Sequence, residues 1–253
     1  MTRRSFTVHL WRSFTHVAGS VLIVAALAAA QPHAGLAQTT GSPLKIGIVG
    51  AGREGGALGT LFVKAGHPVM FSSRHPDNLK DLVGGLGPLA KAGTVDEAVA
   101  FGDVVLLVVP YPAIEEIGKV HAGALAKKAL VMDVSNPSAG RDGEALVKSV
   151  NDQGGAGLMT AKWLPGAPLV RAFNAINFRR LPELSHRAGE PLGVPIAGDD
   201  PKAIELAQTL IREIGFEPVL VGGLAMGKYL VPGGPFGAEH TPAEIKQIAG
   251  TLH

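Results

Sequence analysis

Residues 44–59 read LKIGIVGAGREGGALG, and this stretch decides the fold. Residues 44–49 form an apolar run typical of a buried strand, and a helical pattern follows over residues 54–65. The turn between them, Gly50-Ala51-Gly52-Arg53-Glu54-Gly55, has the spacing G-x-G-x-x-G. In this context we interpret it as a dinucleotide-binding turn, although a tight turn without a ligand is the alternative.

Each glycine of this turn has a separate steric task. Gly50 permits the tight turn, Gly52 lets a pyrophosphate approach the backbone, and Gly55 lets the helix pack close to the strand. The helix N-terminus then offers unpaired N–H groups to the anion. Arg53 is open to two interpretations, a phosphate or adenine contact and a solvated side chain.

Strand-like runs and helical patterns alternate along the rest of the chain. The strands are expected at residues 69–73, 104–109, 129–134, 169–173, 192–197 and 218–221, and the helices at 77–83, 94–101, 113–127, 201–214 and 241–252. This alternation predicts an α/β fold of the Rossmann type, doubly wound around a mostly parallel sheet, with a short C-terminal extension. Residues 38–43 are a polar lead-in, 44–222 the NAD(P)-binding domain, and 223–253 a Gly/Pro-rich extension with a terminal helix.

Residues 1–37 have the pattern of a signal peptide. A cationic start with Arg3 and Arg4 precedes a short apolar stretch, and small residues stand before Gln38. The Arg-Arg pair favours the twin-arginine type, and an ordinary secretory signal is the alternative. We therefore expect an exported protein, periplasmic or otherwise extracytoplasmic, with no stable membrane span after cleavage.

The composition limits the chemistry. The chain of 253 residues has no cysteine, 5% aromatic residues and a net charge of +2. Thiolate metal sites and disulfides are thereby excluded, and nucleic acid is an unlikely partner by charge. The nine histidines show no metal-ligand spacing, so no metal is expected. We therefore expect a bound cofactor to supply the reactive group.

The choice between NAD and NADP depends on the end of the second strand. An NAD site usually carries an acidic residue there, but this chain has Ser73 and Arg74. A guanidinium and hydroxyl groups suit a 2′-phosphate, so we expect NADP(H); a solvated turn is the alternative.

Three further strand ends carry candidate site residues. They are Val109, Pro110 and Tyr111; Asn136 and Pro137; and Asn174 and Asn177. The carboxyl ends of parallel strands meet at one edge of the sheet, where ligands bind. The asparagines could instead satisfy their own turns.

Residues 45–223 resemble the NADPH-dependent coenzyme F-420 reductase family. The resemblance rests on the glycine turn, Ser73-Arg74, residues 103–111, Val134-Ser-Asn-Pro137, Val170-Arg-Ala-Phe-Asn174 and residues 194–200. It implies that Ala51 to Glu54 line the pyrophosphate, that Ser73 and Arg74 hold the 2′-phosphate, and that Asn78 is a further contact. It also places Val109, Pro110 and Ala172 near the nicotinamide. The same residues also resemble the first half of pyrroline-5-carboxylate reductases and the NADPH module of ferric reductases. Pyrroline-5-carboxylate reductases, which reduce imines, need a large helical C-terminal domain to complete their site, and the short segment after Val221 argues against that function here.

These observations predict an NADPH-dependent oxidoreductase that passes hydride to coenzyme F-420, a flavin or a related small-molecule acceptor. We expect an open cleft walled by Pro110, Tyr111, Asn136, Asn174 and Met226. The alternatives are a non-catalytic NADP-binding redox sensor or partner subunit, and an electron donor like the ferric reductases. A homodimer is left open.

Overall fold

The computed structural model of the protein describes residues 43–252. The predicted signal peptide and most of the lead-in lie outside the described residues, so export stays a prediction. Within residues 43–252, no helix is both long and apolar enough to cross a bilayer.

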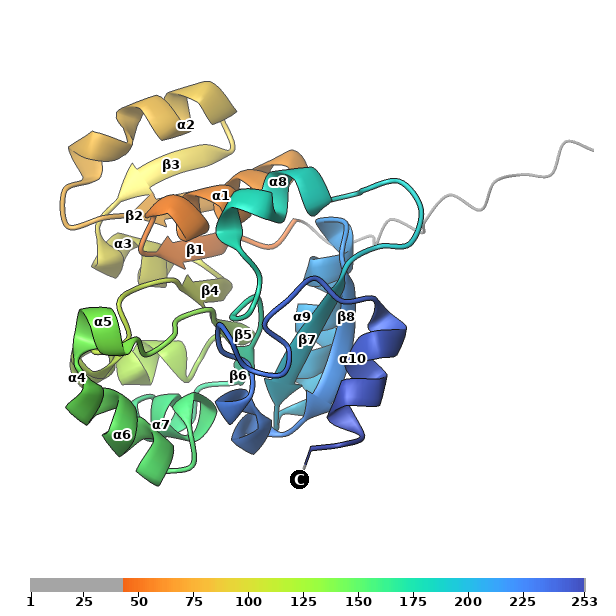
Figure 1. Ribbon diagram of the computed structural model, residues 1–253. Coiled ribbons are helices and arrows are strands. Elements are labelled where there is room, and N and C mark those ends of the chain that lie inside the picture. Colours follow the sequence, from red (N-terminus) through yellow and green to blue (C-terminus); the bar gives the residue numbers. More distant parts are fainter. Residues whose placement is uncertain (1–42, 253) are drawn as a thin grey trace, which may run out of the picture. The chain divides into compact units, whose positions relative to one another are not determined.

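An eight-stranded sheet forms the centre of this domain (Figure 1). Its spatial order is β3-β2-β1-β4-β5-β6-β7-β8. The strands are β1 (Ile46–Val49), β2 (Val69–Ser72), β3 (Ala90–Gly93), β4 (Val104–Leu107), β5 (Leu130–Asp133), β6 (Leu169–Arg171), β7 (Gly193–Gly198) and β8 (Glu217–Gly222). The first six are parallel in the order 3-2-1-4-5-6, which is the Rossmann arrangement.

The last two strands change direction. β7 pairs antiparallel with β6 and parallel with β8, so the sheet is mostly parallel, as predicted.

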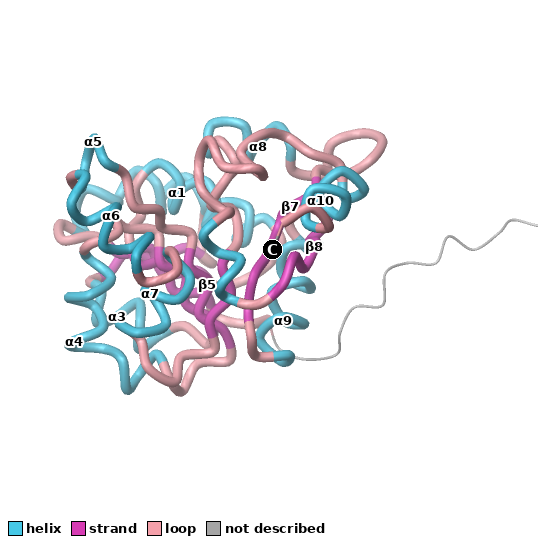
Figure 2. The backbone as a smooth tube through the Cα atoms, turned by 60° about the horizontal axis from the view of Figure 1, so that its bottom comes forward, coloured by secondary structure: helices cyan, strands magenta, loops and turns pink. Residues whose placement is uncertain are grey.

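Helices cover both faces of the sheet (Figures 1 and 2). They are α1 (Arg53–Lys64), α2 (Lys80–Leu86), α3 (Val95–Phe101), α4 (Ala113–Leu125), α5 (Ala139–Asp142), α6 (Glu144–Asp152), α7 (Ala156–Trp163), α8 (Leu181–Leu184), α9 (Pro201–Glu213) and α10 (Pro242–Ala249). Short 3₁₀ turns, η1 (Pro76–Leu79), η2 (Phe178–Arg180) and η3 (Leu224–Lys228), link some of them.

Alternation along the strands divides the core into two layers. In β4, Val104 and Leu106 face the layer of α1, α8 and α9, whereas Val105 and Leu107 face the layer of α3, α4 and α7. All four side chains are fully buried, which explains the uninterrupted apolar run in the sequence. A third cluster joins α10 and the C-terminal segment to β7 and β8.

Several helices begin at residues whose side chains cap the first turn. Asp200 accepts hydrogen bonds from the N–H groups of Lys202 and Ala203 at the start of α9. Thr94 and Glu97 form a reciprocal capping box at α3.

Several elements of the domain were not predicted: β3, helices α5 to α8, and the turns η2 and η3. Strand β3 has the sequence AKAG, which is poor in β-formers, and it forms because it pairs with β2. Helices α5, α6 and α7 occupy the long connection between β5 and β6. The predicted helix over 77–83 is divided into η1 and α2, since Pro76 begins a 3₁₀ turn.

Candidate functional site

The glycine turn after β1 is held by close backbone contacts. Gly50 has a φ of +99°, and a Cβ there would collide with the carbonyl oxygen of Val108. The N–H of Ala51 donates to the carbonyl of Ser72 at 2.8 Å, and the N–H of Gly50 to its hydroxyl at 3.4 Å. The turn is thereby fixed between the ends of β2 and β4.

The other two glycines leave the start of α1 open. A Cβ on Gly55 would collide with the carbonyl oxygen of Gly50, so helix and turn are in direct contact. A Cβ on Gly52 would meet nothing within 4 Å. Gly52 is the N-cap residue and supplies no side-chain cap. The N–H groups of the first helical turn therefore face open space, where an anion can bind them.

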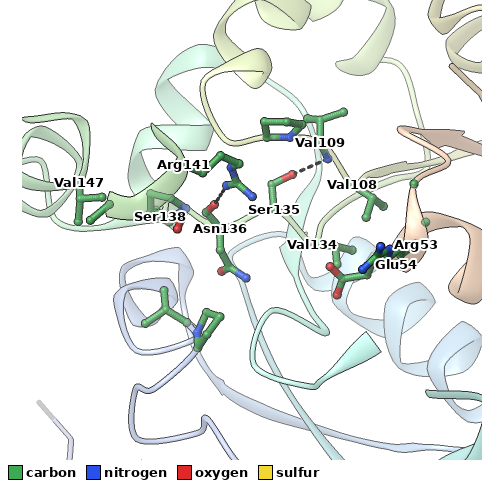
Figure 3. A pocket seen from close by; sticks show the side chains of 18 of the residues that line it. Arg53, Glu54, Val108, Val109, Val134, Ser135, Asn136, Ser138, Arg141 and Val147 are labelled. Carbon is green, nitrogen blue, oxygen red and sulfur yellow. Dashed lines mark hydrogen bonds between the residues drawn. The ribbon is translucent and has the colours of Figure 1, made fainter. Parts of the chain in front are cut away.

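A cavity of about 710 Å³ lies in front of this turn, at the carboxyl ends of β1, β4 and β5. In Figure 3, Arg53 and Glu54 lie at one side of it, and Ser138 and Val147 at the other. Its lining residues come from four segments: 52–55; 108–110; 134–139 with Arg141, Val147, Asn151 and Ala156; and Lys228, Val231 and Pro232.

Ser135 joins the ends of β4 and β5 at the cavity floor. Its hydroxyl accepts from the N–H of Val109 and donates to the carbonyl of Leu107, both at 3.2 Å. The first of these bonds is drawn in Figure 3. The loop bearing Val109 and Pro110 is thus held in place against the cavity.

A buried polar network lies under the floor, centred on the ion pair of Asp133 and Arg171. Both side chains are fully buried, and Arg171 Nη1 lies 2.5 Å from Asp133 Oδ2. The carboxylate also accepts from the hydroxyl of Thr160 at 2.8 Å and from the N–H of Ser135 at 2.9 Å. These bonds satisfy the buried carboxylate, as a buried ion pair requires, whereas Nε of Arg171 has no hydrogen-bond partner among the described residues.

The same arginine fixes Asn136 and the C-terminal segment. Arg171 Nη2 donates to Asn136 Oδ1 at 3.1 Å and to the carbonyl of Leu230 at 3.3 Å. Asn136 Nδ2 donates in turn to the carbonyl of Asn174 at 2.7 Å. The Asn136 side chain therefore lines the cavity in a fixed orientation.

Glu54 is the acid closest to the open helix end in the sequence, and it lines the cavity. Its side chain is half-buried, and this burial raises its pKa to about 7. At neutral pH a large share of Glu54 is therefore uncharged, and the negative charge opposing an anion at the turn is reduced.

Residues 45–137 match the family model described as NADP oxidoreductase coenzyme F420-dependent. This match confirms the family resemblance, and it covers the glycine turn and the floor segment that ends at Pro137. The matched residues thus belong to the half of the domain that carries the glycine turn.

Solved structures support the same fold. A hypothetical protein, SMa0349 of Sinorhizobium meliloti, is 27% identical with a TM-score of 0.65, and the match covers 79% of this chain and 96% of that one. A candidate F420-dependent NADP reductase of Arthrobacter sp. FB24 is 20% identical with a TM-score of 0.64, covering 73% and 87%. The Escherichia coli K12 protein YjhV is 38% identical over 60 residues, which are 24% of this chain and 42% of YjhV.

The structure brings many of the expected site residues to the cavity. Those that line it are Gly52, Arg53, Glu54, Gly55, Val109, Pro110, Asn136 and Pro137. Gly50 and Ala51 shape the turn behind the lining. Ser73, Arg74 and Asn78 lie outside the cavity, after the end of β2, where Arg74 and Asn78 are exposed. Ser73 Oγ accepts from the N–H of His75 at 3.1 Å.

The substrate-side candidates are placed differently from the expectation. Tyr111 is fully buried, and its hydroxyl donates to the carbonyl of Ala156 at 2.7 Å; burial raises its pKa. Asn174 is 3% exposed and donates to the carbonyls of Asp133 and Ser135. Neither residue lines the cavity, so both belong to its support.

Three more expectations need the same correction. Asn177 is exposed and caps η2 by accepting from the N–H of Arg179 at 3.1 Å. Met226 packs in the cluster of β7, β8 and α10, and Ala172 lies in the core. Asn177 thus follows the turn chemistry that was the stated alternative for the asparagines, whereas Met226 and Ala172 pack against apolar neighbours.

The sequence did not reveal the part of the cavity wall that follows β8. Lys228, Val231 and Pro232 come from the Gly/Pro-rich segment, and Arg141 and Asn151 from the unpredicted helices. No periodic pattern marks this segment, and its place is set by contacts with α7. A Cβ on Gly157 of α7 would collide with the carbonyl oxygen of Leu224, so only a glycine permits this approach.

Proposed function

We propose that the protein is an NADP(H)-dependent oxidoreductase that transfers hydride between NADP(H) and a deazaflavin-like or flavin-like acceptor. The proposal rests on one continuous cavity that extends from the open glycine turn to the C-terminal segment. Its volume of about 710 Å³ suits a cofactor end and a second small molecule together.

The residues present fit the cofactor. The open space at Gly52 and the uncapped first turn of α1 suit a pyrophosphate. Val109, Pro110 and Pro137 offer apolar walls to the nicotinamide ring. When bound, NADPH supplies the hydride, and the chain's residues hold and orient the two reactants.

Orientation is the main catalytic contribution that we propose. Among the described residues that line the cavity, Glu54 is the only carboxyl group, and it lies at the pyrophosphate end. The Asn136 amide and the backbone at Val109 are held by hydrogen bonds from beneath. A fixed stacking geometry can contribute several kcal/mol without an acid or base, about 7 or more in favourable cases.

We expect Arg74 to select NADP(H) over NAD(H). It is exposed beyond β2, and no hydrogen bond or ion pair engages its guanidinium among residues 43–252. Arg74→Ala should weaken NADP(H) by about 1.5–3 kcal/mol, the size of a charged hydrogen bond, and leave NAD(H) nearly unchanged. Titration calorimetry with both cofactors measures this.

The neighbouring cation Lys80, which pairs with Asp77, is the matched control. Lys80→Ala should change neither affinity by more than about twofold, the size of a weak exposed ion pair. Equal losses for NADP(H) and NAD(H) in Arg74→Ala would refute this role for Arg74.

Cofactor binding should also depend on the charge of Glu54. Its pKa is about 7, so the carboxyl is mostly neutral at pH 6 and mostly ionised at pH 8.5. The ionised form repels the pyrophosphate, so affinity should fall as the pH rises. In Glu54→Gln this loss should disappear, with a difference of about fivefold at pH 8.5, or roughly 1 kcal/mol of repulsion.

The measurement is the ratio of Kd values for NADP⁺ in Glu54→Gln and in the wild type, at pH 6 and 8.5. Ionisation of the cofactor's own phosphate changes both Kd values equally, so it does not affect this ratio. A ratio that stays constant across the pH range would show that Glu54 does not oppose the cofactor.

The rival function is a non-catalytic NADP-binding sensor or subunit, which the absence of a second carboxyl or a histidine from the lining of the described cavity favours. Anaerobic oxidation of NADPH by a deazaflavin, FMN, FAD and ferric chelates separates the two. Turnover with a deazaflavin or flavin supports the proposal, turnover with ferric chelates alone favours an electron donor, and tight NADPH binding without oxidation by any acceptor favours the sensor.

A further inference from the structure

The cavity has two chemically different ends. The end at the glycine turn carries Arg53 and Glu54, and the far end is formed by α5, α6, the start of α7 and the C-terminal segment. The far end has apolar walls of Pro137, Val147, Val231 and Pro232, with two cationic side chains, Arg141 and Lys228. No acid of the described chain lines it, so it suits an apolar body that carries a negative group.

The two cations of the far end differ in their partners. Arg141 Nε lies 2.8 Å from Asp142 Oδ1, and its Nη2 donates to Asp142 Oδ2 at 2.8 Å and to the carbonyl of Asn136 at 2.6 Å. Its charge is therefore already compensated. Lys228 is exposed, and within residues 43–252 no carboxylate pairs with it; its ammonium lies 4.8 Å from the centre of the Tyr229 ring. Lys228 is thus the cation that remains available at this end.

The backbone at Lys228 is held firmly. Gly155, with a φ of +99°, lies against it, since a Cβ on Gly155 would collide with Lys228. A Cβ on the preceding Gly227 would lie 2.7 Å from Arg171 Cδ and 3.0 Å from the Cα of Gly157. Arg171 also donates to the carbonyl of Leu230, two residues further on. The lysine is therefore presented by a segment with contacts on both sides.

We propose that Lys228 binds the negative group of the acceptor, and that the site selects acceptors that combine an apolar ring system with a phosphate or carboxylate. This inference rests on the proposed function and adds the class of acceptor. A charge-assisted contact from an ammonium that has no carboxylate partner favours anionic over neutral acceptors with the same rings.

FMN and riboflavin test this selection directly, because they share one ring system and differ by the phosphate. Binding is measured by flavin fluorescence with NADP⁺ at saturation, which does not require turnover. Wild-type protein should bind FMN at least about tenfold more tightly than riboflavin, the lower limit for a charged hydrogen bond. Lys228→Ala should weaken FMN about 10- to 100-fold, leave riboflavin within about twofold, and leave NADP⁺ binding unchanged.

Alanine keeps the Cβ that packs on Gly155, so the backbone contact survives. Lys228→Arg should keep most of the preference for FMN because it keeps the charge. Lys162→Ala is the matched control, since Lys162 lies on α7 and donates to Gln153 rather than lining the cavity. It should bind both flavins as the wild type does.

Three results would overturn the inference: no measurable FMN binding, equal affinity for FMN and riboflavin in the wild type, or a loss of NADP⁺ affinity in Lys228→Ala as large as that of FMN. The last result would assign Lys228 to the cofactor. A different result would contradict only the proposed function: FMN binds through Lys228, but neither FMN nor a deazaflavin oxidises NADPH. Turnover without a preference for the charged flavin would remove this inference and leave the function in place.

Discussion

Gly52→Val is expected to abolish NADP(H) binding while the domain stays folded. The position has a φ of −72°, which valine adopts readily, and a Cβ there meets nothing within 4 Å. The branched side chain would instead occupy the space in front of the first turn of α1, where the pyrophosphate must approach. We expect a loss of at least about 100-fold in affinity, since both the anion contacts and the close approach to the backbone are removed.

Calorimetric titration measures the affinity, and thermal unfolding of the unliganded variant checks the fold. Gly84→Val is the control, because Gly84 lies in α2 and a Cβ there also meets nothing within 4 Å. It should bind NADP(H) as the wild type does. Gly52→Val that binds within a few-fold of the wild type would show that the turn does not hold the cofactor.

Arg171→Met should destabilise the domain by about 3–5 kcal/mol, the cost of leaving a buried charge without its partner. Asp133 is fully buried and would keep only the hydroxyl of Thr160 and the N–H of Ser135 as donors. The variant also loses the bonds that hold Asn136 and Leu230. Equilibrium unfolding in urea at pH 7 measures the change in free energy.

The double variant Asp133→Asn with Arg171→Met separates charge from packing. An uncharged asparagine can accept from the N–H of Ser135 and donate its amide to the hydroxyl of Thr160, which can turn to donate to Tyr111. The double variant should therefore recover part of the lost stability. A double variant as unstable as Arg171→Met would contradict the assignment of the loss to the unpaired carboxylate.

The parts of the fold that the sequence revealed are those fixed by local rules. The order of strands and helices follows from buried apolar runs and capping residues such as Asp200, and the positions of Gly50 and Gly55 follow from steric needs of a single turn. Strand β3 was not predicted because its residues have little strand propensity and form a strand only by pairing with β2.

The candidate site was predictable only where the chain itself forms the turn. Tyr111 and Asn174 stand at strand ends, as substrate contacts would, yet they donate to buried carbonyls whose positions depend on the tertiary fold. Asp133 and Arg171 lie in strands without any local sign of pairing, because 38 residues separate them along the chain. Lys228 reaches the cavity through glycine contacts with α7, which no periodicity in its own segment indicates.

Direct hydride transfer at this cavity can be followed with an isotope label. NADPH carrying deuterium on the transferable C4 position is incubated with the protein and a 5-deazaflavin, whose reduced C5 position holds the isotope without exchange. We expect one deuterium in the reduced deazaflavin by mass spectrometry and a slower rate than with unlabelled NADPH. Reduced deazaflavin without deuterium, or no reduction while NADPH remains bound, would contradict it.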